Sequence, residues 1–455
     1  MRLAEAAAAI GARVAGADVP FTSVATDSRA LGAGALFVAI RGERFDGHDF
    51  VAAARDAGAA AALVSDPARC GGAGLPLLVA DDTRAALARL AAHWRRRFAI
   101  PVVAVVGSNG KTTVTQMLAA ILRAQWGEAG VLATAGNLNN DIGLPVMALA
   151  LRAGHRVAAL EIGMNHPGET ARLAAVAQPT IALVNNAQRE HQEFMKSVAE
   201  VAREHAAAIE RLPADGIAVV NADDDHAAYW RGVAGTRRVR DFGLDHPAAV
   251  TATYRLLDFG AELEIAAPEG RVAVTTSAAG VHNIANALAA AAAATAAGAG
   301  LDAVARGLAA FRAVKGRLQK KRGRGGATLL DDTYNANPDS VIAAIDVLAR
   351  AGGEKLLVLG DMGEVGEQGP AFHEEVGRHA RARGVDFLLA TGPATRAAVR
   401  AFGPGAEHFE DVDALAARAE RLLTACTTAL VKGSRSMRME RVVERLEEKD
   451  RAACC

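Results

Sequence analysis

The sequence predicts an α/β protein of three domains, with a doubly wound, mostly parallel sheet in the central one. The chain has 455 residues, which corresponds to about three domains of ordinary size. Short apolar runs alternate with helical stretches over most of its length, a pattern typical of parallel sheets covered by helices. One apolar run, residues 102–106, leads into residues 107–113 (GSNGKTT) and then a helical pattern. This is the setting of a nucleotide-phosphate loop.

The first predicted domain is a small α/β unit formed by residues 1–97. Apolar runs at residues 36–40 and 61–64 predict strands. Residues 50–57 predict a helix that ends at Gly58.

The second predicted domain covers residues 98–313, and the third covers residues 314–455. Strands of the central sheet are expected at residues 102–106, 157–160, 181–184 and 217–220. Residues 249–276 alternate between apolar and polar positions, which indicates an antiparallel extension of that sheet. The third domain repeats strand and helix as a Rossmann-like unit, with strands expected at residues 328–330, 356–359, 387–390 and 428–431.

The composition argues against nucleic acids and membranes as partners. Lys plus Arg and Asp plus Glu both number 51, so the protein as a whole has no electrostatic attraction for polyanions. Aromatic residues make up 4% of the chain, which leaves few rings for stacking on bases. A basic run at residues 312–324 is the alternative for nucleic acid and is disfavoured on these grounds. No run of about 18 strongly apolar residues predicts a membrane span.

The cysteines and the N-terminus indicate a cytoplasmic protein, which we expect to be a monomer. Cys70, Cys426, Cys454 and Cys455 show neither metal-ligand spacing nor a disulfide pattern, which fits a reducing compartment. The last two lie at a terminus that is expected to fray. Residues 3–10 are rich in alanine but include an acidic residue, so we expect a surface helix there rather than a signal peptide.

The glycine loop after residues 102–106 carries the strongest functional signal. Glycines let the backbone turn its N–H groups toward phosphate oxygens, Lys111 can neutralise phosphates, and the Thr112 hydroxyl can hold Mg²⁺. A plain strand-to-helix turn is the alternative. Val105 stands where the usual phosphate loop has a further glycine, so this loop is a shorter variant. The predicted ATP contacts in it are Gly107, Ser108, Asn109, Gly110, Lys111, Thr112 and Thr113.

Two polar segments follow other strands of the central sheet. Glu161 comes directly after residues 157–160, and functional groups gather at the carboxyl edge of parallel strands. We therefore predict that Glu161 binds the Mg²⁺ of MgATP, with a solvated glutamate at a strand end as the alternative. His191 lies in the polar segment after residues 181–184. It is either the ligand of a second cation, as a neutral imidazole, or an ordinary surface or packing residue.

Further polar segments belong to the start of one helix and to three strand ends. Asn283 and Asn286 open an alanine-rich helix, where they either contact an adenine edge or cap the helix. Polar loops also follow strands of the third domain at residues 331–338, 359–364 and 432–435, although the first of these fits ordinary turn chemistry as well. Because the three loops fall at one edge of a sheet, they predict a cleft that faces the phosphate loop.

Together these motifs resemble those of the Mur ligases of bacterial cell-wall synthesis, over essentially the whole chain. The matching segments are residues 27–29, 37–39, 46–48, 107–113, 136–140, 161–165, 282–286, 332–338, 359–364 and 432–435. YNANP at 334–338 and KGSR at 432–435 are similar to the branch that adds D-alanyl-D-alanine to UDP-N-acetylmuramoyl-tripeptide. The resemblance implies a three-domain, ATP- and Mg²⁺-dependent, ADP-forming peptide ligase of peptidoglycan precursor synthesis, acting through an acyl phosphate.

The resemblance also implies roles for individual residues. The UDP part of the substrate would be held by Ser28, Arg29, Asp46 and His48. ATP would be held at its phosphates by Lys111 and Arg317, at its ribose by Asp331 or Asp332, and at its adenine by Asn283 and Asn286. The first Mg²⁺ would be bound by Thr112 and Glu161, and the second by His191. The peptide substrates would be contacted by Asn137, Asn139, Tyr334, Asn335, Asn337, Lys432, Ser434 and Arg435. The residues in direct contact with the reaction would be Lys111, Glu161, His191 and Arg317.

One position departs from the family pattern. Many Mur ligases carry a lysine on the helix after the His191 segment, and this lysine is carbamylated and supports the second Mg²⁺. Here the helix reads AREHA at residues 202–206 and has no lysine. We hypothesise that Glu204 supplies the anionic oxygens directly, which predicts that Glu204→Ala lowers Mg²⁺-dependent turnover.

Two other functions remain open from the sequence. A different ATP-dependent amide ligase, such as the Mur ligase that adds the third peptide residue or a folylpolyglutamate-type enzyme, shares the phosphate loop. A non-ligase NTPase would hydrolyse ATP without the two peptide substrates. The polar loops that begin at Tyr334 and Lys432 argue against the NTPase, because an enzyme that only hydrolyses ATP does not need them.

Overall fold

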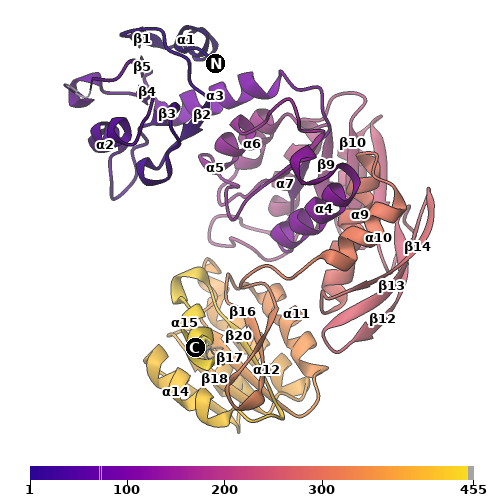
Figure 1. The fold of residues 1–455 in the computed structure, drawn as a ribbon. Coiled ribbons are helices and arrows are strands. Elements are labelled where there is room, and N and C mark those ends of the chain that lie inside the picture. The colour runs from indigo at the N-terminus through magenta and orange to yellow at the C-terminus, as the bar shows by residue number, and fades with distance from the viewer. Residues whose placement is uncertain (71, 73, 449–455) are drawn as a thin grey trace, which may run out of the picture.

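The computed structural model describes residues 1–70, 72 and 74–448, so Cys454 and Cys455 lie outside the described residues. Figure 1 shows three lobes, with the N-terminal and C-terminal lobes attached to the central one. Each of the four sheets lies inside one of the three predicted ranges, although the boundaries at residues 97 and 313 stay predictions. Within the described part of the chain, no helix is both long and apolar enough to cross a membrane.

The N-terminal lobe contains a five-stranded sheet in the order β1-β5-β4-β3-β2. Its strands are β1 Arg13–Ala15, β2 Ser23–Ala25, β3 Ala35–Val38, β4 Ala61–Val64 and β5 Leu77–Val79. The helices are α1 Leu3–Ile10, α2 Val51–Asp56 and α3 Thr83–Arg95. The predicted strands at 36–40 and 61–64 correspond to β3 and β4, which are fully buried. Strands β1, β2 and β5 were not expected, because three residues are too short for a visible alternation.

The central sheet has six strands in the order β11-β10-β9-β6-β8-β7, and all of its pairs are parallel. The strands are β6 Val102–Val106, β7 Val131–Ala133, β8 Val157–Glu161, β9 Ile181–Val184, β10 Ile217–Asn221 and β11 Arg238–Phe242. The helices around it are α4 Lys111–Trp126, α5 Gly143–Leu149, α6 Glu169–Ala177, α7 Val198–Glu210 and α8 Ala227–Ala234.

Strand β6 explains why an uninterrupted apolar run predicted this sheet. Val102, Ala104 and Val106 contact one hydrophobic core, while Val103 and Val105 contact the core on the other face. A strand with helices on both sides buries both sets of side chains, so it reads as a continuous apolar segment.

Residues 251–276 form an antiparallel sheet of their own, which corrects the expected extension of the central sheet, although Val250 makes a single bridge to Phe242 of the central sheet. The strands β12 Thr251–Leu257, β13 Gly260–Ala267 and β14 Gly270–Thr276 pair in that order. The alternation in the sequence identified the strands, but it carries no information about which sheet they join. Helix α9 Val281–Ala296 lies between the two sheets, followed by α10 Leu301–Ala310. The many alanines of α9 are buried, as expected for a small-residue helix packed against a sheet.

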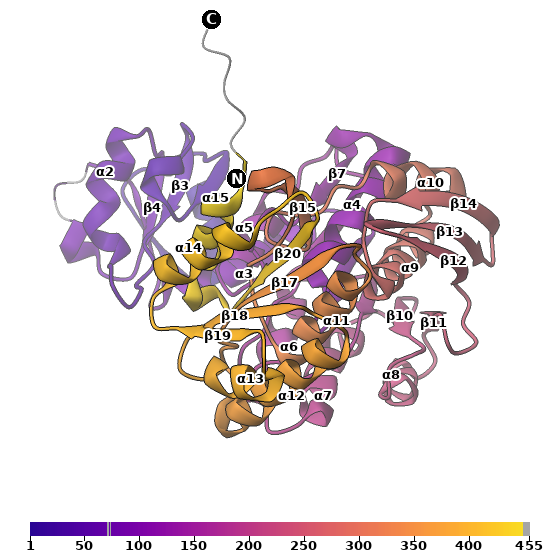
Figure 2. The ribbon, with the colours of Figure 1, turned by 90° about the horizontal axis from the view of Figure 1, so that it is seen from below.

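The C-terminal sheet has the order β15-β16-β20-β17-β18-β19, with only β15 antiparallel. Its strands are β15 Gln319–Arg322, β16 Thr328–Asp332, β17 Glu354–Gly360, β18 Phe387–Thr391, β19 Ala406–Phe409 and β20 Thr427–Lys432. Figure 2 shows α11 and α12 on one face, and α14 and α15 on the other. The helices are α11 Pro338–Ala349, α12 Gly369–Ala382, α13 Thr395–Phe402, α14 Val412–Leu422 and α15 Glu440–Leu446. Because β16, β20 and β17 are neighbours, the three predicted polar loops emerge side by side.

Candidate active site

A cavity of about 330 Å³ lies between the central and C-terminal domains. The phosphate loop, β8 and the segment after β9 line one side, and the loops after β16 and β17 line the other. A second cavity of about 280 Å³ lies behind the phosphate loop, toward the start of α9. Asn109 and Arg317 line both cavities. Two of the three predicted polar loops therefore line the first cavity, and Lys432 at the end of β20 lines the second cavity.

Two positions of the phosphate loop, Gly107 and Gly110, require glycine. Gly107 and Gly110 have φ angles of 142° and 81°, which L-residues with a side chain rarely adopt. A Cβ atom on Gly110 would also overlap the side-chain oxygen of Asn286. Lys111 then begins α4, which is 16 residues long, so the N-terminal end of a full helix faces the cavity.

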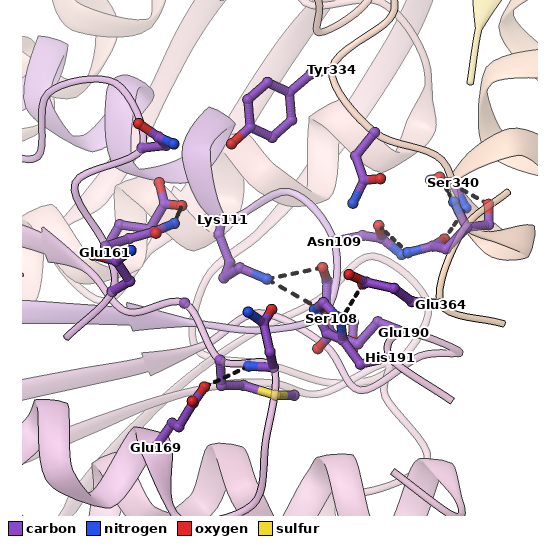
Figure 3. Close-up of a pocket in the computed structure, with 18 of the residues that line it drawn as sticks. Ser108, Asn109, Lys111, Glu161, Glu169, Glu190, His191, Tyr334, Ser340 and Glu364 are labelled. Atoms are coloured by element: carbon purple, nitrogen blue, oxygen red, sulfur yellow. Dashed lines mark hydrogen bonds and ion pairs between the residues drawn. The ribbon is translucent and has the colours of Figure 1, made fainter. Parts of the chain in front are cut away.

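Lys111 lies folded back over its own loop. Its Nζ donates hydrogen bonds to the carbonyl oxygens of Gly107 (2.5 Å) and Ser108 (3.1 Å), and lies 3.4 Å from Glu190 Oε2. Figure 3 shows the ammonium group between Glu161 on one side and Ser108 with Glu190 on the other. The loop carbonyls and Glu190 thus bind the ammonium group of Lys111, and a phosphate would bind this group more strongly.

Glu161 is a buried carboxylate with one oxygen that has no hydrogen-bond partner. Its side chain ends β8, and the residue is 2% exposed. Oε1 accepts hydrogen bonds from Thr112 Oγ1 (3.2 Å) and Asn139 Nδ2 (2.6 Å), whereas Oε2 has no hydrogen-bond partner. A hydroxyl beside a carboxylate with a free buried oxygen is a fitting donor set for Mg²⁺. No group of three or more His, Cys, Asp or Glu among the described residues could hold a cation unaided, so further ligands would have to come from a phosphate or water.

Glu190 is a candidate site residue that the sequence analysis did not single out. It lies in the segment after β9, is 5% exposed and lines the first cavity. Its Oε2 lies 3.4 Å from Lys111 Nζ and 3.8 Å from His191 Nε2, and its Oε1 lies 3.1 Å from His205 Nε2. Burial raises the pKa of Glu190, but Lys111 and the two histidines outweigh it and hold that pKa at about 2. In the sequence, the feature that could have identified Glu190 is its position beside His191 in a polar segment at a strand end.

Three side chains of the central domain form polar contacts with the C-terminal domain near the first cavity. Arg189 forms ion pairs with Asp339 (2.5 Å) and Glu375 (2.7 Å), and these two carboxylates raise its pKa. His191 Nδ1 lies 2.6 Å from Glu364 Oε2. The side chain of Asn337 donates to that of Asn109 (2.9 Å). Asn109, His191, Asn337 and Glu364 line the first cavity, whereas Arg189, next to Glu190 in sequence, joins the same two domains without lining it.

The second cavity is lined by amides that hold one another in place. Asn185 Nδ2 donates to Asn286 Oδ1 (2.9 Å), Asn286 Nδ2 donates to Asn283 Oδ1 (3.0 Å), and Asn283 Nδ2 donates to the Ala279 carbonyl (2.8 Å). The alternative in which these amides cap α9 does not hold, because Gly280 is the N-cap and has no side chain to donate or accept. His282 lines the same cavity, and burial lowers its pKa to about 4.

Comparison with known proteins decides the family. Models described as "Mur ligase family, catalytic domain", "Mur ligase middle domain" and "Mur ligase, glutamate ligase domain" match residues 20–95, 105–294 and 316–435. The chain belongs to the Mur ligase family. The resemblance stated from its motifs is therefore confirmed, and each matched range lies inside one predicted domain.

Similar proteins cover almost the whole chain. It is 44% identical over 95% of both chains to the UDP-N-acetylmuramoyl-tripeptide–D-alanyl-D-alanine ligase of Escherichia coli (strain K12). The enzyme of the same name from Bacillus subtilis (strain 168) is 32% identical over 93% of both chains. A crystal structure of MurF from Acinetobacter baumannii has a TM-score of 0.90 at 33% identity, covering 99% of both chains. The Thermotoga maritima MurF ligase in complex with ADP has a TM-score of 0.81 at 27% identity, covering 93% of this chain and 96% of that one. The predicted α/β fold is thus confirmed as that of a Mur ligase.

Most of the residues predicted to contact ATP or peptide in this Mur ligase line one of the two cavities. The first cavity collects Ser108, Asn109, Lys111, Asn137, Asn139, Glu161, His191, Arg317, Tyr334, Asn335 and Asn337. The second collects Asn109, Gly110, Thr112, Thr113, Asn283, Asn286, Arg317, Asp332 and Lys432. The guanidinium of Arg317 lies 4.0 Å from the centre of the Tyr334 ring, which fixes Arg317 at the passage between the cavities.

Four predicted contacts of the C-terminal domain lie elsewhere or have other partners. Asp331 is 1% exposed and accepts a hydrogen bond from Thr333 (2.7 Å), so of the two ribose candidates only Asp332 faces a cavity. Lys432 is 2% exposed and forms an ion pair with Asp332 (2.6 Å), which makes it a buried link between β20 and β16. Neither Ser434 nor Arg435 lines the cavities, and Arg435 pairs with Glu440 (3.1 Å).

The residues assigned to UDP lie in the N-terminal domain and line neither cavity. The Arg29 side chain is 88% exposed and pairs with Asp27 (2.7 Å), and Ser28 begins the short turn that Asp27 caps. His48 is 1% exposed, and its Nε2 accepts from the backbone of Ser65 (2.9 Å) while its Nδ1 lies 2.6 Å from Asp46. His48 therefore holds the loop together, whereas Arg29 is exposed and paired with Asp27.

The hypothesis that Glu204 supplies metal-binding oxygens is not supported by this geometry. Its Oε2 accepts from the backbone N–H of Gly168 (2.8 Å), and its Oε1 from that of Thr170 (2.7 Å). Glu204 therefore accepts hydrogen bonds from two N–H groups at the start of α6 that have no partner within the helix, and it does not line the first cavity. One residue further along α7, about a quarter-turn of helix away, His205 points to Glu190 instead.

Proposed function

We propose that this Mur ligase joins D-alanyl-D-alanine to a UDP-N-acetylmuramoyl-tripeptide, with conversion of ATP to ADP and phosphate, in peptidoglycan precursor synthesis. The observation that carries the proposal is the first cavity, where Lys111 faces Tyr334, Asn335 and Asn337 from the other domain. The near full-length similarity to D-alanyl-D-alanine ligases of that name supports the choice of substrates.

ATP is needed because a carboxylate does not accept an amine unaided. The terminal carboxylate of the tripeptide attacks the γ-phosphorus, the bond to the bridging oxygen breaks, and ADP leaves. Lys111 exchanges its loop carbonyls for phosphate oxygens, and the N–H groups at the start of α4 face the same charge. Arg317 adds a second cation from the C-terminal side of the cavity.

Mg²⁺ fits the Thr112–Glu161 site, because Glu161 keeps a buried oxygen without a partner. When bound, Mg²⁺ supplies positive charge that neutralises phosphate oxygens during transfer. Asn139 donates to the other oxygen of Glu161 (2.6 Å) and so fixes the direction of the carboxylate.

In the second step the free amine of D-alanyl-D-alanine attacks the acyl carbon of the acyl phosphate. Phosphate leaves, the amine loses a proton, and the new amide bond forms. Water would destroy the acyl phosphate, so the cavity must be closed during both steps. Arg189 and Asn109 contribute to that closure, since each bonds the C-terminal domain.

The same proposal extends to the parts of the molecule outside the cavities. The N-terminal domain, with the exposed Arg29 and the Asp46–His48 loop, holds the UDP part of the substrate. The enzyme works as a monomer in the cytoplasm. Its described cysteines, Cys70 and Cys426, are free thiols, which suits a reducing compartment.

The test is phosphate release from ATP by the purified protein with UDP-N-acetylmuramoyl-tripeptide, in the presence and absence of D-alanyl-D-alanine. We expect release only with both substrates, and a product whose mass equals that of the joined peptides. Release with an amino acid and a dipeptide-bearing nucleotide, or with a folate, would assign the chain to another ligase. Release with ATP alone at the same rate would make it a simple NTPase.

A further inference from the structure

Glu190 is a buried carboxylate that the steps above do not use. It lies on the inner side of the first cavity, directly before His191, and its side chain is 6% exposed. Lys111 supplies the full positive charge beside it, at 3.4 Å. The negative charge of Glu190 is thus compensated by Lys111, which the proposed reaction requires at the phosphates of ATP.

Binding of ATP changes this balance of charge. Lys111 has to leave the loop carbonyls and turn toward the phosphates, which removes the partner of Glu190. A buried carboxylate without a cation is costly, and the triphosphate brings further negative charge into the same cavity. A divalent cation beside Glu190 would compensate both.

The helix behind Glu190 is arranged to support it. His205 on α7 is 1% exposed, and its Nε2 lies 3.1 Å from Glu190 Oε1. Its Nδ1 has no hydrogen-bond partner, so Nε2 is the ring atom that contacts Glu190 and sets the position of its carboxylate. Helix α7 carries no lysine, and Lys196 before it is exposed. A carbamylated lysine on this helix is therefore not available to the site.

We propose that Glu190, held in place by His205, is the anionic ligand of a second divalent cation that enters with ATP, together with His191. The inference rests on the proposed function, because it concerns the same cavity. Glu190 has two successive partners: Lys111 before ATP binds and the cation afterwards. Glu190 thus does the work assigned to a carbamylated lysine in other Mur ligases, and this enzyme needs no carbon dioxide. His205 is a positioning residue.

The test counts the divalent cations bound with the nucleotide. Mn²⁺ is titrated into the full chain with a non-hydrolysable ATP analogue, and free Mn²⁺ is measured by electron paramagnetic resonance. We expect the wild type to bind a second, weaker Mn²⁺, and Glu190→Gln to lose at least about tenfold in affinity for that ion alone. Glu193→Gln, three residues along in the same segment and exposed, is the matched control and should leave both ions bound. A second Mn²⁺ with unchanged affinity in Glu190→Gln would overturn the proposal.

Two further measurements keep the result interpretable. His205→Asn retains the anion and loses the imidazole, so we expect a smaller loss of affinity for the second Mn²⁺ with an unchanged affinity for the analogue without metal. Turnover of the wild type in carbon-dioxide-free buffer should equal turnover with bicarbonate, and a reversible loss would contradict the proposal. Thermal unfolding of each variant with the analogue reports whether it is folded. An inactive wild type refutes the proposed function. If the wild type is active but Glu190→Gln has an unchanged affinity for the second Mn²⁺, only this inference is refuted.

Discussion

Removal of the Arg189 side chain should loosen the contact between the central and C-terminal domains. Arg189 joins the segment after β9 to Asp339 on α11 and Glu375 on α12. The three side chains are 24%, 23% and 38% exposed, so the cluster is neither fully solvated nor fully buried. Exposed pairs contribute about 0.2–1 kcal/mol and hydrogen bonds to charged groups about 1.5–3 kcal/mol. The backbone N–H of Arg189 also donates to Asp339 (2.9 Å) and survives the substitution.

From these limits we expect Arg189→Ala to cost about 2 kcal/mol of docking free energy, or about a thirtyfold shift toward separated domains. Small-angle X-ray scattering of the nucleotide-free protein should show a larger radius of gyration. The kcat/KM for phosphate release should fall by at least about tenfold, because a smaller fraction of the molecules then has the two domains closed around the substrates.

Arg378→Ala is the matched control for this prediction. Arg378 lies on α12 as well, but it pairs with Glu374 on the same helix and is 58% exposed. It should change neither the scattering nor the kinetics. If Arg189→Ala has the radius of gyration and kcat/KM of the wild type, the Arg189 contacts do not hold the domains and the reasoning is wrong.

Three further substitutions test other parts of the site. Gly110→Ala should abolish ATP binding in an equilibrium titration, because the φ angle is 81° and a Cβ would overlap Asn286; unchanged affinity would contradict this phosphate-loop geometry. Lys432→Ala leaves Asp332 buried without its partner and should cost about 3–5 kcal/mol in denaturant unfolding, whereas a loss below about 1 kcal/mol would mean the pair is not buried. Burial lowers the pKa of His282 to about 4 from 6.5, so the unfolded chain binds the extra proton between those values and stability falls as pH drops from about 6.5 to 4. His282→Asn should remove up to about 3 kcal/mol of that loss, and an unaltered pH profile of unfolding would count against a lowered pKa of His282.

Sequence reasoning located the parts of the fold that are buried on both sides. Strands β6, β9 and β10 are continuous apolar runs because helices cover both faces of the sheet. The edge strand β11, RVRDF, is half exposed and carries charges, so no apolar pattern marks it. The sheet of β12 to β14 was recognised as antiparallel, but its separation from the central sheet depends on the packing of α9, which periodicity does not encode.

The candidate site was predictable where chemistry demands a residue type in a fixed local setting. Lys111 after a glycine loop and Glu161 at a strand end both lie where that logic put them. Residues whose role depends on partners distant in sequence were not distinguishable. Glu204 looked like a metal ligand but binds the N-terminus of α6. Glu190 lies beside His191 in sequence, but only its contacts with Lys111 and with His205 on the next helix mark it as a candidate site residue.

The central claim is that ATP activates the tripeptide by phosphorylating its terminal carboxylate in the cavity around Lys111. The measurement is the fate of oxygen-18 placed in that carboxylate, with ATP, Mg²⁺ and D-alanyl-D-alanine present. We predict that each turnover transfers one labelled oxygen to the released phosphate, detected by mass spectrometry, and that Lys111→Ala abolishes the transfer. Unlabelled phosphate released during formation of the joined peptide would contradict the account.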